Sequence, residues 1–400
     1  MPLRRLLRLS AAVPGGLRRS LTTAASHPPW GMMNRIVAAA PGEPSANVYL
    51  NQPPRVSNMY VPMHLVKTGP QPDPDGEIAQ MVGGEIRATS GDGLLFLLYT
   101  DLRFVAPILG KQGSSRVRHP PIDVDRTHTP DITRFVFNPL TRQLSRLPDI
   151  ACIPATKQVG ERGGLAVPTP FCARRMNIDH ETLAFGGRLW WVDVTWGAIS
   201  ADPFSDRPEL SFVELPRGSV LPAGAQDEAR RRGSPLPDAE GNVWWMQAPA
   251  RYRRVGVSEG RLRYVEVSRE EPFLLSSFAL DADGSGWTLE HRVALSKLWA
   301  DGGYPWPWLP LQEGKTPQIG LLDPLNANLV YVSVDEQAIV VVDMDRKEVI
   351  GGVYPYTGDA YCVPCVLPPW LQSSQIPSAG NKGAEENKNL ADVLVRPDTL

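Results

Sequence analysis

Short apolar runs separated by polar turn-forming residues recur from about residue 47 to residue 354. Most runs hold β-branched or aromatic residues and are bounded by Gly, Pro, Asp or Asn, which is typical of short β-strands. We therefore expect strands at 47–50, 93–100, 133–138, 188–196, 210–215, 242–247, 253–258, 261–268, 274–280, 286–295, 329–334, 338–345 and 348–354.

Several of these runs share one format, in which a turn residue precedes an apolar or aromatic strand. The turn residues are Gly93, Gly187, Gly241, Gly260 and Asn328, which are types that tolerate positive φ. Their spacing is uneven, so the repeat is degenerate. The pattern favours an all-β fold, namely a β-propeller-like array of short antiparallel hairpins. A large sandwich or barrel built from similar hairpins is the alternative.

Helical periodicity is rare after the amino-terminal segment. The best candidates are 181–185, 225–232 and 293–300. The chain contains 40 Pro and 35 Gly among 400 residues, an excess that suits many tight turns between short strands.

The amino-terminal segment differs from the rest of the chain in charge. Residues 1–26 contain five arginines and no acidic residue, whereas the remaining residues hold 36 basic and 43 acidic side chains. A body with a formal charge of −7 does not suit a broad nucleic-acid-binding surface, and we expect no nucleic-acid partner. There is also no run of about 18 apolar residues that predicts a transmembrane helix.

A cationic, amphipathic, hydroxyl-rich leader is typical of organelle transit peptides. We predict that residues 1–29 form a mitochondrial transit peptide, which engages the import machinery and directs the protein to the matrix. Chloroplast and cytosol are the alternative locations. We expect a single β-propeller-like domain over residues 30–371 and a disordered tail over residues 372–400, which has a disordered composition.

The tryptophan-rich run at 188–196 is a candidate binding surface. Strand alternation places Trp190 and Trp191 on opposite faces, with Asp193 on the Trp191 face. Trp191, Asp193 and Trp245 could form a ligand or partner surface. Core packing for the tryptophans, and turn capping or cross-strand pairing for Asp193, is the alternative.

Cys362 and Cys365 form the single Cys-x-x-Cys motif and are a weak redox candidate. They lie in a strand-like run flanked by proline, whereas a thioredoxin-like site needs a helix start. Buried structural thiols are the alternative. Cys152 and Cys172 are 20 positions apart, which is not the spacing of a second zinc knuckle. We expect no catalytic residue, metal or cofactor, because no P-loop, GxGxxG, GxSxG or HExxH motif is present.

The sequence from Arg188 through Ser219 resembles the plant family called domain of unknown function 1618, which is expanded in grasses. The resemblance continues at 256–268, 276–295, 319–334, 342–352 and 365–371. Residues 134–149 also resemble F-box-associated propeller-like domains. The resemblance implies an all-β propeller-like fold and no established catalytic residues. The stretch 150–173 is shorter than the family pattern, which predicts an incomplete array.

These observations favour a non-enzymatic protein-binding scaffold in plant mitochondria. The alternative is an enzyme with a polar pocket at the centre of the ring. Fold class alone does not decide between them.

Overall fold

The computed structural model is built almost entirely from β-strands, which confirms the all-β class. It describes residues 27–73, 78–105, 123–124, 130–148, 165–166, 175–176, 181–205, 209–222, 249–300, 316–334, 337–354 and 362–376. Within these ranges one α-helix occurs, α3 (Leu295–Ala300), inside the segment for which a helix is predicted. Short 3-10 turns are η1 (Met63–Leu65), η2 (Pro249–Arg251) and η3 (Pro369–Gln372).

Three four-stranded antiparallel units follow one another along the chain, each with its strands paired in sequence order. The β12 unit contains β12 (Glu181–Phe185), β13 (Arg188–Asp193), β14 (Gly197–Ala201) and β15 (Ser211–Glu214). The β16 unit contains β16 (Arg253–Ser258), β17 (Arg261–Val267), β18 (Leu274–Leu280) and β19 (Trp287–Ala294). The β20 unit contains β20 (Gln318–Leu322), β21 (Leu329–Val334), β22 (Ala338–Asp343) and β23 (Glu348–Val353).

The remaining large sheet consists of two further units that share strands. In the β5 unit, β5 (Ile78–Thr89), β6 (Leu95–Val105), β8 (Asp131–Phe137) and β9 (Leu144–Arg146) pair in order, with β7 (Asp123–Val124) against β6. In the β24 unit, β24 (Cys362–Val366) pairs with β1 (Trp30–Asn34), then β4 (Val56–Pro62) and β3 (Asn47–Tyr49). Strand β2 (Ile36–Ala40) joins the units because it pairs with both β4 and β5.

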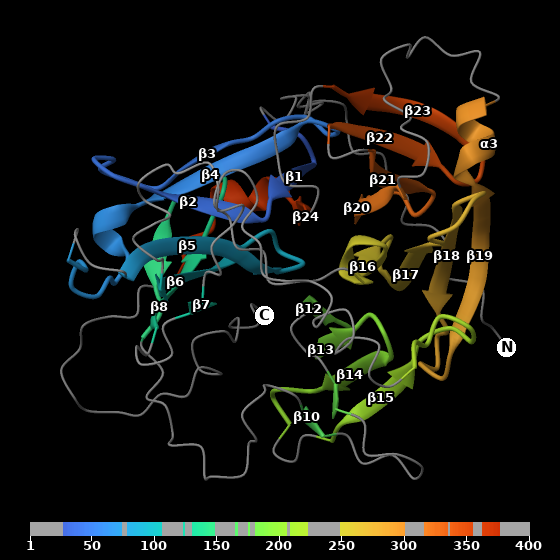
Figure 1. Ribbon diagram of the computed structural model, residues 1–400, viewed down its shortest axis with the longest axis horizontal. Helices are drawn as coiled ribbons and strands as arrows, with labels where there is room; N and C mark the ends of the chain where they lie inside the picture. The colour runs from blue at the N-terminus through green and yellow to red at the C-terminus, as the bar shows by residue number, and fades with distance from the viewer. Residues whose placement is uncertain are drawn as a thin grey trace, which may run out of the picture.

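The first strands of the five units form a closed circuit of contacts. Strand β5 contacts β12, β12 contacts β16, β16 contacts β20, β20 contacts β24, and β24 contacts β5 (Figure 1). The pairing of carboxy-terminal β24 with amino-terminal β1 completes this propeller-like ring. The stretch 150–173, where strands were expected to be missing, lies outside the described residues apart from β10 (Leu165–Ala166), which pairs with β11 (Arg175–Met176).

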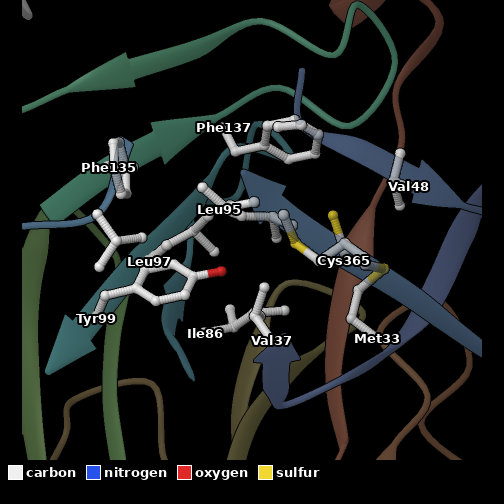
Figure 2. Close-up of a cluster of buried hydrophobic side chains, with 14 of the residues drawn as sticks. Met33, Val37, Val48, Ile86, Leu95, Leu97, Tyr99, Phe135, Phe137 and Cys365 are labelled. Carbon is white, nitrogen blue, oxygen red and sulfur yellow. The ribbon is translucent and has the colours of Figure 1, made fainter. Parts of the chain in front are cut away.

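Buried apolar clusters fill four of the interfaces between neighbouring units. The largest lies between the β24 and β5 units and includes Met33, Leu97, Tyr99, Phe135 and Cys365 (Figure 2). Others join the β12 and β16 units, the β16 and β20 units, and the β20 and β24 units. Among the described residues no such cluster joins the β5 and β12 units. Burial of these faces is the main contribution that holds the units together.

Two sequence-based expectations about local structure were wrong. Residues 181–185 form β12 and not a helix, because five consecutive residues pair with β13. The ordered contacts also continue through Ile376, beyond the predicted boundary at Leu371. The turn prediction is confirmed at three glycines, Gly93, Gly187 and Gly260, whose φ values are 87°, 71° and 68°.

Candidate functional site

At the centre of the ring, the buried side chain of one inner-strand arginine forms hydrogen bonds with three of the other four inner strands. Arg254 of β16 is ion-paired with Glu181 of β12. Its Nη1 donates to the carbonyl of Gly320 in β20 at 2.5 Å, and its Nη2 donates to the carbonyl of Cys362 in β24 at 3.1 Å. The Arg254 side chain is only 4% exposed.

Adjacent Arg253 occupies the opposite face of β16, as strand alternation requires. Its Nη1 donates to the carbonyl of Val194 at 3.2 Å and to that of Ser219 at 2.5 Å. Arg253 therefore links β16 to the segments that follow β13 and β15, whereas Arg254 links β16 to β12, β20 and β24. Only Arg254 takes part in the contacts at the ring centre.

The fifth inner strand, β5, carries a second charged cluster. Arg35, between β1 and β2, donates from Nε to one oxygen of Glu85 at 3.3 Å. Arg87 is paired with the other oxygen of Glu85 at 3.0 Å. Both oxygens of the Glu85 carboxylate are therefore engaged by guanidinium groups.

Both clusters join separate elements of the structure through charge-assisted hydrogen bonds. The carboxylates of Glu85 and Glu181 are both held by arginine, and Arg254 spends its donors on main-chain carbonyls. In the part of the chain that the structure describes, no group of three His, Cys, Asp or Glu side chains is placed to hold a metal ion.

Two of the three residues of the predicted ligand or partner surface, Trp191 and Asp193, lie on β13. Trp190 is buried and donates from Nε1 to the carbonyl of Phe185 at 3.1 Å, whereas Trp191 is half-buried on the opposite face. Asp193 is 1% exposed, and its Oδ1 accepts hydrogen bonds from the main-chain N and the hydroxyl of Thr195. A carboxylate so enclosed offers no surface to a partner. Trp245 lies outside the described residues.

The two cysteines of the predicted redox motif are buried in different clusters. Cys362 packs between the β20 and β24 units, and Cys365 packs between the β24 and β5 units. Burial raises the pKa of the Cys365 thiol to about 12, which disfavours the reactive thiolate. Their placement on an extended strand differs from the helix start that a thioredoxin-like site requires.

Sequence reasoning missed an exposed apolar pair in the connection between β14 and β15. Phe204 and Leu210 are 61% and 60% exposed, and both flank the same connection. The signal for Phe204 is its position beside Asp202 and Pro203, where turn composition predicts exposure, whereas Leu210 begins the predicted strand 210–215 and has no such signal. Asp202 forms a turn of the kind that its residue type favours, since its Oδ1 accepts a hydrogen bond from the main-chain N of Phe204 at 2.9 Å.

Arg188 pins the base of the same connection. Its Nη2 donates to the carbonyl of Ser200 at 3.0 Å, to the carbonyl of Glu209 at 3.3 Å and to the hydroxyl of Ser211 at 3.1 Å. The described ends of the connection are thus hydrogen-bonded to the sheet.

No helix among the described residues is long and apolar enough to span a membrane.

Three solved structures show weak similarity to this chain. Apo AztD from Citrobacter koseri is 10% identical, with a TM-score of 0.26 over 72% of this chain and 82% of that one. The Cps50 (Swd1) β-propeller domain from Myceliophteria thermophila is 10% identical, with a TM-score of 0.25 over 70% and 89%. BamB from Moraxella catarrhalis is 9% identical, with a TM-score of 0.23 over 73% and 88%. Likeness at this level does not bear on function.

No curated protein matches the chain. Residues 191–340 match the family model described as "Protein of unknown function (DUF1618)". The matched region covers β14 through β21 entirely, together with the second half of β13 and the first half of β22. It therefore includes Arg254, Gly320 and the connection that carries Phe204 and Leu210. By this match, residues 191–340 are similar to the DUF1618 family, in agreement with the resemblance seen in the sequence.

Proposed function

We propose that this protein is a non-enzymatic protein-binding scaffold that works in the mitochondria of a plant. Residues 1–29 would engage the import machinery, and the ring would hold a protein partner in the matrix. The exposed pair Phe204 and Leu210 is the observation that carries the proposal. Exposed large apolar side chains held on an anchored loop are a common basis of protein interfaces.

The anchoring of this loop favours binding. Asp202 fixes the main chain at Phe204, and Arg188 fixes it at Glu209. Residues that are hydrogen-bonded in place before binding lose less conformational entropy when a partner docks. The two apolar side chains are therefore presented at a small entropic cost.

The centre of the ring supports a scaffold more than an enzyme. Arg254 and Glu181 join inner strands, and Glu85 is held by two arginines. These groups stabilise a rigid frame on which loops can be displayed. The same side chains would have to leave their partners before they could act on a substrate.

Affinity capture from mitochondrial extract would test the proposed surface. The full chain would be compared with the double variant Phe204→Ala/Leu210→Ala and with Ile350→Ala. Ile350 is a matched control because it is 47% exposed on β23, in another unit. We expect the double variant to lose at least about tenfold of a captured partner and Ile350→Ala to retain it. Equal capture by all three chains would contradict the proposed surface.

Targeting requires a separate experiment. A fluorescent fusion of residues 1–40 should accumulate in mitochondria, because the leader is cationic, amphipathic and free of acidic residues. Replacing Arg4, Arg5 and Arg8 by Gln should abolish the accumulation. A cytosolic or chloroplast signal from the unmodified fusion would overturn the mitochondrial part of the proposal.

A further inference from the structure

The chain end that follows the ring-closing strand is held by a turn of a different unit. After β24, residues 371–376, the first two of which belong to η3, lie against the turn between β8 and β9. We call residues 371–376 the latch, and we call Asn138 and Gln143, at the two ends of that turn, the seat. The latch thus connects the β24 unit with the β5 unit at the seam between the two chain ends.

Asn138 is fully buried, and hydrogen bonds within its own turn hold its side-chain amide in place. Its Oδ1 accepts hydrogen bonds from the main-chain N of Leu140 at 3.0 Å and from that of Thr141 at 3.2 Å. This arrangement aims Nδ2 at the latch, where it donates to the carbonyl of Leu371 at 3.0 Å and to the hydroxyl of Ser374 at 3.1 Å. The amide is therefore preorganised by its own turn.

Both ends of the Gln143 side-chain amide form hydrogen bonds with the main chain of the latch. Its Nε2 donates to the carbonyl of Ile376 at 2.9 Å, and its Oε1 accepts from the main-chain N of Ile376 at 2.8 Å. A neighbouring β-strand makes the same pair of bonds to a residue. Recognition of this kind depends on the peptide backbone and not on a particular side chain.

Apolar anchors and free space accompany these hydrogen bonds. Leu371 is fully buried in the cluster between the β24 and β5 units, and Ile376 is 8% exposed. A hollow of about 570 Å³ lies beside the seat, lined by the uncharged polar residues Thr141, Gln143, Gln372, Ser373, Ser374 and Gln375. The anchors Leu371, Ser374 and Ile376 define the spacing Leu-x-x-Ser-x-Ile.

We propose that the seat is a peptide-binding site that reads main-chain groups and is occupied by the chain's own latch. A free peptide with the spacing Leu-x-x-Ser-x-Ile competes with the latch for Asn138 and Gln143. The site does not depend on the surface proposed around Phe204, which lies in another unit. When the latch occupies the seat, it adds a second connection across the closure of the ring. A peptide can replace the latch there while β24 stays paired with β1.

The test uses the full chain and a fluorescent synthetic peptide of residues 367–379. In the full-length variant Ile376→Asp, a charge replaces a buried anchor and should release the latch. We expect the peptide to bind this variant at least about tenfold more tightly than the unmodified protein. The double variant Ile376→Asp/Gln143→Ala should lose that gain, and a peptide carrying Asp at position 376 should bind neither protein.

Equal peptide binding by the unmodified protein and Ile376→Asp would overturn the proposal, as would undiminished binding by the double variant. If Ile376→Asp does not fold, the milder variant Gln143→Ala decides. Hydrogen exchange at the amide of Ile376 should then accelerate at least about tenfold, with the amides of β24 unchanged. Unchanged exchange at Ile376 would refute recognition by Gln143.

Discussion

The guanidinium of Arg254 and the carboxylate of Glu181 form an ion pair between β16 and β12, although 73 positions separate the two residues. The same guanidinium binds a carbonyl of β20 and a carbonyl of β24. A single side chain therefore depends on the correct placement of four inner strands. Substitutions of Arg254 should therefore be a sensitive test of whether the ring of units is closed.

Arg254→Met should lower the free energy of unfolding by about 3–5 kcal/mol, because it leaves a buried carboxylate and two carbonyls without their donor. Glu181→Gln should cost less, since the amide keeps an acceptor for Arg254. Urea unfolding measures both. Arg346→Met is the control: its side chain is 71% exposed and should change stability by less than about 1 kcal/mol. A loss of similar size at positions 254 and 346 would show that the central pair adds no special stability.

Two consecutive glycines of β5 should differ sharply in their tolerance of alanine. A Cβ on Gly84 would lie 2.3 Å from Cε1 of Tyr99 and 2.5 Å from the carbonyl oxygen of Val37, whereas a Cβ on Gly83 meets nothing within 4 Å. Overpacking of this kind costs about 1–3 kcal/mol or more. Thermal unfolding should show a clear loss for Gly84→Ala and almost none for Gly83→Ala. Equal tolerance would mean that β2, β5 and β6 pack less closely at this point.

Cys362 and Cys365 should be unreactive in the native protein. Both are buried, and thiol reagents attack the exposed thiolate. In a Cys152→Ser/Cys172→Ser background, labelling at pH 8 should proceed no faster than unfolding, and denaturant should release two thiols. Rapid native labelling of either cysteine would contradict the packing at β24 and revive the redox hypothesis.

Alkaline pH should weaken the contribution of Cys365 to stability. Burial raises the pKa of its thiol from 9.0 to about 12, so the unfolded chain loses this proton first as the pH rises. The stabilisation is therefore complete below about pH 9 and declines as the pH approaches 12, by at most about 1.4 kcal/mol per pH unit. The stability difference between the unmodified protein and Cys365→Ala should shrink between pH 8 and pH 10.5. A constant difference would mean that the thiol titrates normally in the fold.

Trp30 should be essential for closing the ring. It is 5% exposed on β1, and its ring meets Tyr331 of the β20 unit edge-on, with centroids 5.5 Å apart. Trp30→Ala should cost about 3–5 kcal/mol of unfolding free energy, and Trp30→Phe should cost less. Tyr49→Ala, at a site that is 60% exposed, serves as the control in the same calorimetric measurement. Similar losses at both positions would contradict the role of Trp30.

Many of the outer and middle strands could be predicted from the sequence, whereas most inner strands could not, and β1, β4, β9 and β14 were also missed. Runs such as 261–267 and 338–343 are rich in β-branched and aromatic residues, and their local composition is sufficient. By contrast, β5 contains Gly83 and Gly84, and β12 has the composition of a helical turn. Contacts with other units impose the extended conformation there, and a single local window does not contain that information.

The central cluster was equally inaccessible to local reasoning. Arg253 and Arg254 are adjacent, and alternation requires that one of them face inward, but the partners of Arg254 are 66, 73 and 108 positions away. The latch was missed for a similar reason, because 233 positions separate Gln143 from Ile376. Spacing in the sequence therefore does not indicate which residues these two regions bring together.

Proximity labelling in intact mitochondria tests the scaffold proposal most directly. A labelling enzyme would be fused to the full chain, to Phe204→Ala/Leu210→Ala and to Ile350→Ala. The proposal predicts a reproducible set of neighbouring proteins for the unmodified chain and Ile350→Ala, with at least about tenfold depletion for the double variant. No reproducible neighbour, or an identical set for all three chains, would contradict it.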